Sequence, residues 1–164
     1  MIKINLQNFS ISNNLPFVLI AGPCVLEDEK KSLKIAHEIS KITNELNINF
    51  IFKASFDKAN RSSIQSGRGI SLDNGLKIFE KIKKEFNCPI ITDIHTEEQC
   101  NILNQNDIVD VLQIPAFLCR QTDLLLSAGR TEKVINVKKG QFLAPSDVKN
   151  IYEKIRSTKN NNIM

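Results

Sequence analysis

Five short apolar segments alternate with segments of helical periodicity along this chain, and this alternation restricts the possible folds more than any other feature. The apolar segments span residues 17–21, 49–54, 89–92, 109–114 and 134–137. Strands that are apolar on both faces and alternate with amphipathic helices are typical of a parallel sheet covered by helices. The sequence therefore predicts an α/β fold of five consecutive βα units.

The segments between the predicted strands have the apolar spacing of helices. In residues 31–46, apolar side chains recur every three or four positions and form one buried stripe. Ser71 is expected to cap the second helix, and Ser146 or Asp147 the last one. Residues 2–12 alternate apolar and polar side chains, which predicts a short N-terminal hairpin. Four further helices are predicted, over residues 72–86, 97–103, 122–128 and 148–155.

Polar or reactive side chains stand at the end of every predicted strand or directly after it. They are Cys24, Lys53, Ser55, Asp93, His95, Gln113, Lys138 and Lys139. In a (β/α)8 barrel such strand ends converge on one pocket, whereas in an open doubly wound sheet they spread along an edge. No GxGxxG or P-loop sequence marks a nucleotide crevice, because Gly67-Arg68-Gly69 is too short and follows no strand. Both folds fit the alternation, and we favour the TIM-type barrel.

The segment KASFDKANRSS, residues 53–63, begins where the second strand ends and is dense in polar groups. Lysine and arginine supply positive charge, while asparagine, serine and backbone N–H groups supply directed hydrogen bonds. This mixture suits an anionic, hydroxylated ligand such as a sugar phosphate. The alternative is an ordinary solvated loop.

Composition narrows the class of protein further. A chain of 164 residues is sufficient for one domain. The net charge of +4 is spread along the chain and there is no Trp, which argues against a nucleic-acid binder. No apolar run reaches the length of a membrane span, and no signal peptide is apparent, so we expect a cytoplasmic protein. The four cysteines lack paired spacing and are expected to be thiols.

Five segments resemble the 3-deoxy-D-manno-octulosonate 8-phosphate (KDO-8-phosphate) synthase family, in the family's order. They are IAGPC (20–24), FKASFDKANRSS (52–63), ITDIH (91–95), QIPAFLCRQTDLL (113–125) and INVKKGQFLAP (135–145). The resemblance implies a barrel transferase that condenses phosphoenolpyruvate with arabinose 5-phosphate and water in lipopolysaccharide biosynthesis. The related DAHP synthases share the barrel but match ANRSS and CRQTD less well, and they are the second choice.

The resemblance also implies roles for particular residues. The residues assigned to catalysis are Lys58, Asp93, His95 and Lys138. Those assigned to substrate binding are Lys53, Ser55, Asn60, Arg61, Ser62, Gln113, Phe117 and Arg120. Of these, Phe117 and Arg120 are lent to a neighbouring subunit, which implies a homo-oligomer, a tetramer in the family. Asp93 would orient the lysines or the sugar, and His95 would form part of the polar wall of the pocket.

Cys24 distinguishes two subclasses of the family. By the resemblance, a cysteine here is a thiolate ligand of a divalent metal ion, whereas the metal-free enzymes have asparagine. A lone cysteine would otherwise be interpreted as a small core residue. Cys88, Cys100 and Cys119 are expected to be structural.

The chain is short for the family it resembles, because (β/α)8 barrels span about 250 residues. We interpret residues 1–164 as a single incomplete barrel domain. It comprises a hairpin (1–12), five βα units (16–156) and a polar tail at the start of a missing sixth unit (157–164). The other metal ligands would lie in the missing units, so we expect no bound metal and doubtful activity for this chain alone. A fragment of a working synthase and a non-catalytic remnant both remain open.

Overall fold

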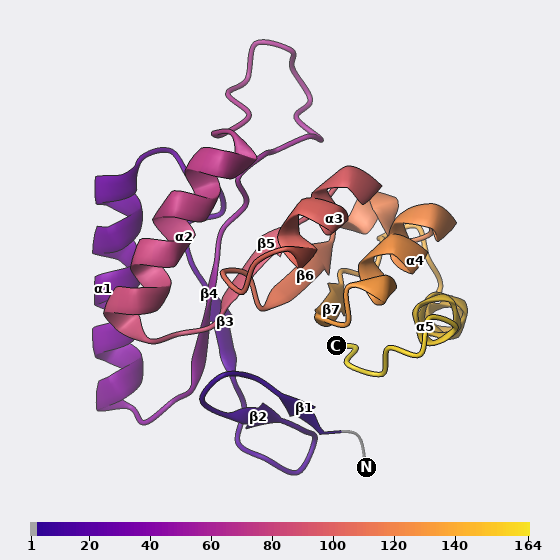
Figure 1. Ribbon diagram of the computed structural model, residues 1–164, viewed down its shortest axis with the longest axis horizontal. Helices are drawn as coiled ribbons and strands as arrows, with labels where there is room; N and C mark the ends of the chain where they lie inside the picture. Colours follow the sequence, from indigo (N-terminus) through magenta and orange to yellow (C-terminus); the bar gives the residue numbers. More distant parts are fainter. Residues whose placement is uncertain (1–2) are drawn as a thin grey trace. The chain divides into compact units, whose positions relative to one another are not determined.

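A computed structural model describes residues 3–164 (Figure 1). Met1 and Ile2, which belong to the predicted hairpin segment, lie outside the described residues. The chain divides into two compact units, residues 1–92 and residues 93–164. Strand β5 (Ile90–Asp93) crosses this border, because its last residue belongs to the second unit.

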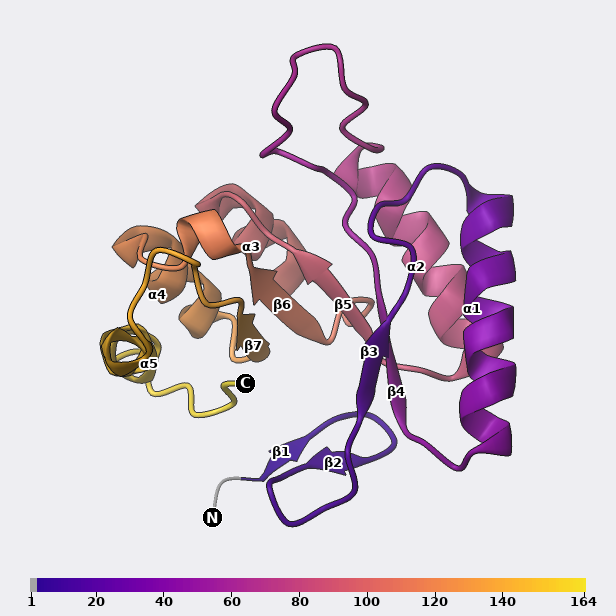
Figure 2. The ribbon, with the colours of Figure 1, turned by 180° about the vertical axis from the view of Figure 1, so that it is seen from behind.

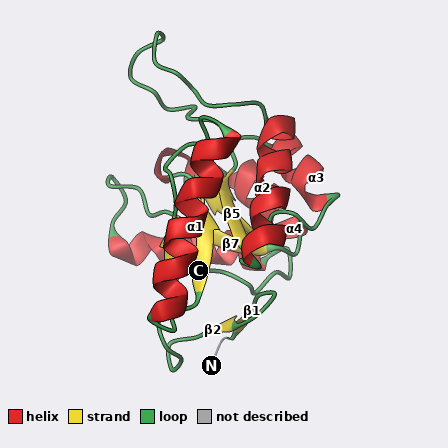
Figure 3. Ribbon diagram, turned by 90° about the vertical axis from the view of Figure 1, so that its left-hand side faces the viewer, coloured by secondary structure: helices red, strands yellow, loops and turns green. Residues whose placement is uncertain are grey.

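The first unit contains the N-terminal hairpin and the first parallel strands. Strands β1 (Ile4–Asn5) and β2 (Ser10–Ile11) pair antiparallel, so the predicted hairpin is confirmed. In Figure 3 these two strands are short beside the long helix α1 of the same unit. Strands β3 (Leu19–Ala21) and β4 (Phe50–Lys53) pair in parallel, and β4 pairs in parallel with β5.

Two helices cover one face of β3 and β4. They are α1 (Glu29–Glu45) and α2 (Leu72–Phe86), which lie side by side (Figures 1 and 2). Helix α1 begins two residues earlier than predicted, because an Asp28 side-chain oxygen accepts the Lys31 N–H at 2.7 Å and caps it there. The predicted Ser71 cap of α2 is confirmed, since its hydroxyl accepts the Asn74 N–H at 3.4 Å.

The second unit repeats the same alternation. Its elements are α3 (Glu97–Asn104), β6 (Val111–Ile114), a 3-10 turn (Ala116–Leu118), α4 (Thr122–Arg130), β7 (Val134–Val137), a second 3-10 turn (Pro145–Asp147) and α5 (Val148–Arg156). Strands β6 and β7 are parallel, with Gln113 opposite Asn136. The backbone N–H of Ile94, directly after β5, donates to the Gln113 carbonyl at 3.0 Å.

The prediction for the start of α5 is wrong in its detail. Neither Ser146 nor Asp147 caps the helix with its side chain, although Asp147 stands at the cap position. The backbone of Asp147 has φ −79° and ψ −11°, which is helical, because the 3-10 turn leads directly into α5. Side-chain capping requires an extended backbone at this position, as at Ser71.

The sheet has the strand order β3-β4-β5-β6-β7, which is also the order of these strands along the chain. A doubly wound sheet reverses its strand order at a switch point, whereas the strands of a (β/α) barrel follow one another without reversal. The predicted α/β fold is therefore confirmed as a partial barrel of the TIM type. No helix of residues 3–164 is long and apolar enough to cross a membrane.

The last residues of the chain pair with β7. The N–H groups of Ile135 and Val137 donate to the carbonyls of Asn162 and Met164, at 2.8 and 3.1 Å. Ile163 forms a parallel bridge with Ile135, and in Figure 1 the C-terminus lies beside β7. This pairing lies where the sequence predicts the beginning of a sixth strand.

Candidate functional site

In the first unit, the end of β4 brings two lysines onto one serine. Ser55 is fully buried, and its hydroxyl oxygen accepts hydrogen bonds from Lys53 Nζ at 3.2 Å and from Lys58 Nζ at 2.9 Å. The hydroxyl has two lone pairs and can accept both. Two ammonium groups that converge on one neutral oxygen form a centre of positive charge, which suits a carboxylate or phosphate group.

Cys24 lies next to this centre. Its carbonyl accepts the Ser55 N–H at 3.2 Å, and the following residue, Val25, forms a parallel bridge with Ser55. The Cys24 side chain is exposed, so the alternative interpretation as a core residue is wrong. The first unit thus brings together four of the predicted site residues, Cys24, Lys53, Ser55 and Lys58.

Gly22 makes this close approach possible. A Cβ atom at Gly22 would lie 2.0 Å from the carbonyl oxygen of Lys53 and 2.8 Å from its carbonyl carbon. The end of β3 can therefore approach β4 this closely only with glycine at position 22. The AGPC motif owes its glycine to this packing requirement.

The predicted sugar-phosphate residues Asn60, Arg61 and Ser62 lie on an exposed loop between β4 and α2 (Figure 1). Arg61 Nε donates to the Gly67 carbonyl at 3.0 Å, so the loop holds its own arginine. No hydrogen bond among the described residues joins these three side chains to Lys53 or Ser55. The structure places them on the loop that follows the lysine centre and does not bring them into contact with it.

The stem of this loop is closed by a pair that the sequence did not reveal. Arg68 Nε donates to an Asp57 carboxylate oxygen at 2.8 Å, and Asp57 forms an antiparallel bridge with Gly69. The hydrogen bond that Arg68 donates to Asp57, together with the negative charge of that carboxylate, raises the pKa of Arg68 above its ordinary value. Gly69 has φ +116°, a conformation that strongly favours glycine.

In the second unit, three polar side chains on adjacent strands form a hydrogen-bonded row. Gln113 Nε2 donates to Asp93 Oδ1 at 2.6 Å, and Asn136 Nδ2 donates to Gln113 Oε1 at 2.8 Å. Asp93 is buried, and Gln113 and Asn136 are partly buried. The predicted residues Asp93 and Gln113 are thus in contact. Asn136 was missed, although a polar residue inside the apolar segment VINV and two positions before Lys138 was a signal for it.

The remaining predicted residues of this unit differ in their surroundings. His95 is partly buried, and its backbone N–H donates to the Gln99 side chain at 2.7 Å. Lys138 is exposed directly after β7, where its N–H donates to the Ile114 carbonyl at 3.1 Å. Its neighbour Lys139 donates through Nζ to the carbonyls of Gly140 and Leu143, at 2.7 and 2.8 Å, and so stabilises the following turn. The two lysines therefore differ, because the side chain of Lys139 is used by the turn that follows β7.

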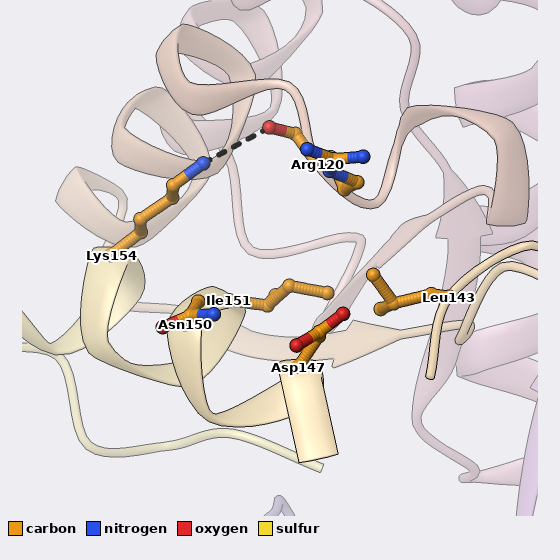
Figure 4. Close-up of a pocket in the computed structure, with 6 residues that line it drawn as sticks. All are labelled: Arg120, Leu143, Asp147, Asn150, Ile151 and Lys154. Atoms are coloured by element: carbon orange, nitrogen blue, oxygen red, sulfur yellow. Dashed lines mark hydrogen bonds between the residues drawn. The ribbon is translucent and has the colours of Figure 1, made fainter. Parts of the chain in front are cut away.

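Phe117 and Arg120 are exposed on the segment after β6. Arg120 lines a pocket of about 400 Å³ whose other walls come from the second 3-10 turn, the residues just before it, and α5 (Figure 4). Lys154 Nζ donates to the Arg120 carbonyl at 3.1 Å, and the buried side chains of Leu143 and Ile151 form the apolar floor. Among residues 3–164 Arg120 forms no ion pair, so its guanidinium is available to an anion.

A metal site is not complete within the described part of the chain. No group of three or more His, Cys, Asp or Glu side chains among these residues could hold a metal ion. Cys88, Cys100 and Cys119 are buried, and burial raises the pKa of Cys100 to about 11. A thiol of this kind is neither a nucleophile nor a metal ligand near neutral pH, as expected for a structural cysteine.

The sequence matches the model of the "DAHP synthetase I family" over residues 1–164. A Bartonella henselae protein named 2-dehydro-3-deoxyphosphooctonate aldolase is 52% identical over 161 residues, which are 98% of this chain and 57% of that protein. Proteins of the same name from Rickettsia bellii and Rickettsia typhi are 55% identical over 154 residues, 94% of this chain and 56% of each relative. The chain therefore spans little more than half the length of these curated relatives.

Proposed function

The chain belongs to the DAHP synthetase I family, and on this premise we propose that it is the N-terminal part of a 3-deoxy-8-phosphooctulonate synthase. This is the enzyme that its relatives' name, 2-dehydro-3-deoxyphosphooctonate aldolase, also denotes. The complete enzyme would condense phosphoenolpyruvate with D-arabinose 5-phosphate and water, and release inorganic phosphate, in cytoplasmic lipopolysaccharide biosynthesis.

The observation that supports this proposal most is the lysine centre on Ser55. Phosphoenolpyruvate has a carboxylate and a phosphate on adjacent atoms, so it needs several cations at one place. Lys53 and Lys58 converge on one buried hydroxyl, at 3.2 and 2.9 Å, and would bind these groups. The ammonium of Lys58 would also stabilise the negative charge that shifts to the phosphate as its carbon–oxygen bond breaks.

The second unit would contribute the groups that orient the substrates. Gln113 presents an amide N–H beside the Asp93 carboxylate, and the exposed Lys138 follows directly after β7. Asp93 would orient the lysines or accept from a sugar hydroxyl, and His95 would line the polar wall. These roles match the polarity of each group, since anions need donors and hydroxyls need acceptors.

The sugar phosphate would be bound by Asn60, Arg61 and Ser62. An arginine matches the geometry of a phosphate with two parallel hydrogen bonds, which a lysine does not. Phe117 and Arg120 are exposed, as required of side chains that reach a neighbouring subunit. We propose that the complete enzyme is a homo-oligomer, a tetramer by family resemblance, in which these two residues close the sugar-phosphate end of the neighbour's site.

A divalent metal does not fit the described residues, because Cys24 is a single ligand and stable binding needs three or four. We therefore assign no step of the reaction to a metal in this chain. In a complete enzyme of the metal-dependent type, Cys24 would supply one thiolate, and the other ligands would come from the part of the protein that this chain does not cover.

The experiment that tests this proposal supplies the missing units. Residues 1–164 are joined to the C-terminal part of the Bartonella henselae relative that the match does not cover, and phosphate release from phosphoenolpyruvate is measured. We expect release only in the presence of arabinose 5-phosphate, a large loss in Lys58→Met, and no loss in the control Lys41→Met on exposed α1. Release with erythrose 4-phosphate instead would favour the DAHP synthase alternative, and no release with either sugar would refute the proposal.

The alternative that this chain is a non-catalytic remnant is tested on the gene rather than on the site residues. A reading frame that continues past the codon for Met164 with further βα units supports an enzyme. An immediate stop codon would make this polypeptide a remnant, and we then expect it to release no phosphate by itself.

A further inference from the structure

The row Asp93–Gln113–Asn136 joins the ends of three neighbouring strands by side-chain hydrogen bonds. Gln113 stands opposite Asn136 in the β6–β7 register, and the two are linked at 2.8 Å. Gln113 is in turn linked to Asp93 at 2.6 Å, and Asp93 is only 7% exposed. A buried carboxylate is costly unless donors satisfy it, and the Gln113 amide is one such donor to Asp93.

The carboxylate determines the direction of every bond in the row. An ionised Asp93 can only accept, so Gln113 must turn its NH2 group toward it. The Gln113 carbonyl oxygen then faces β7, where it needs a donor. Asn136 supplies this donor through its own NH2 group. With Asn136 in place, Gln113 has one orientation in which both of its ends are satisfied.

This orientation also determines what Gln113 presents to a ligand. Its oxygen is occupied by Asn136, and one hydrogen of its NH2 group is bonded to Asp93. The second hydrogen has no protein acceptor among the described residues, so the side chain offers a donor. A flipped Gln113 would instead turn its carbonyl oxygen toward Asp93 and would lose this donor.

We propose that Asn136 is a positioning residue: it fixes the orientation of the Gln113 amide so that the site presents an N–H donor to an anionic substrate beside Asp93. For its effect on catalysis this inference rests on the proposed function. Its structural part, the polarity of the row, is independent of any substrate.

The substitution Asn136→Asp tests the polarity, because it keeps the size and shape of the side chain but replaces the donor by an acceptor. In either orientation of its amide, Gln113 then turns its carbonyl oxygen toward a carboxylate oxygen, either of Asp93 or of the new aspartate. Protonation of the new carboxyl restores a donor, so the folded state raises the pKa of this group. The loss of stability should therefore be present at pH 8 and should shrink as the pH falls, until it nearly disappears at the ordinary aspartate pKa of about 3.9.

The measurement is urea unfolding of the 164-residue chain at pH 8 and pH 4. At pH 8 we expect Asn136→Asp to lower the equilibrium constant for folding about tenfold or more, and at pH 4 to come within about twofold of the parent at the same pH, because the unfolded aspartate has a pKa of about 3.9. The control Asn101→Asp, the same change on the exposed face of α3, should follow the parent at both pH values. Asn136→Ala should be destabilised equally at both, because it has no group to titrate.

An equal loss at pH 8 and pH 4 in Asn136→Asp would overturn the inference, since the residue would then only fill space. A parent chain without a cooperative urea transition would also overturn it, because a fixed row needs ordered strands. In the joined protein described above, Asn136→Asp should raise the KM for phosphoenolpyruvate at pH 8 and recover at lower pH. If the joined parent protein is inactive, the proposed function fails while the unfolding result still decides the polarity of the row.

Discussion

Replacing Gly22 by alanine is the sharpest test of how the lysine centre is built. The added methyl group would meet the Lys53 carbonyl oxygen at 2.0 Å, where ordinary contacts begin at 3.4 Å. The ends of β3 and β4 would have to separate by about 1.4 Å, the difference between these two distances. The obstructing atoms belong to the backbone, so no side chain can rotate to relieve the contact.

Overpacking of this kind costs about 1–3 kcal/mol in well-packed sites. We place Gly22→Ala at the upper end, about 3 kcal/mol, because the strand itself must move. Domains of this size are stable by about 5–15 kcal/mol, so the loss is a large share of the total. With a urea dependence of about 2 kcal/mol per molar, the unfolding midpoint should fall by about 1.5 M.

The matched control is Gly67→Ala, because a Cβ atom there meets nothing within 4 Å. Both variants are unfolded in urea and followed by circular dichroism, and both are assayed for phosphate release in the joined protein. We expect Gly67→Ala to unfold like the parent and Gly22→Ala to lose both stability and activity, since displacement of β4 moves Lys53. Equal midpoints for Gly22→Ala and the parent would refute the reasoning that the close approach of the two strands requires glycine.

Three further predictions concern single residues. In the joined protein, Arg61→Ala should raise the KM for arabinose 5-phosphate about 10–100-fold, because charge-assisted hydrogen bonds contribute about 1.5–3 kcal/mol. The KM for phosphoenolpyruvate should stay unchanged, and Arg130→Ala is the control. Equal effects on both substrates would contradict this. Chelation should abolish the activity of that protein, and a divalent ion should restore it. In the Cys24→Ser variant the ion should not restore activity, and full activity of the parent in excess chelator would exclude the metal-dependent type. The unfolding free energy of the 164-residue chain should fall by about 2–3 kcal/mol between about pH 9 and 11, because the unfolded Cys100 thiol loses its proton before the folded one, whose pKa is about 11. The Cys100→Ala variant should lack this part of the decrease. An identical decrease in that variant would disprove the prediction.

The order and type of the secondary structure could be predicted from the sequence. Strand β7 occupies residues 134–137 as predicted, and Ser71 caps α2. These features depend on neighbouring residues, since apolar periodicity and capping act within one turn or one strand. The alternation of strand and helix likewise limits the fold to a parallel α/β arrangement, and the polar strand ends favoured the barrel.

The contacts between the candidate residues could not be predicted from the sequence. The sequence indicated Lys53, Ser55 and Lys58 as candidates, but not that the two lysines share the Ser55 hydroxyl. Asn136 was overlooked because its partner Gln113 is 23 residues away, and only the β6–β7 register places the two opposite each other. The Asp57–Arg68 pair was hidden for a similar reason, since it depends on how the loop returns to its own stem.

The features that follow from the sequence are therefore local: where strands and helices lie, which of them are capped, and which polar residues stand at strand ends. Which of those residues are in contact depends on the tertiary structure. A one-residue change in strand register moves every side chain to the opposite face. Hydrogen bonds between side chains of different strands, such as the row from Asp93 to Asn136, exist only once the register is fixed by the packing of the whole sheet.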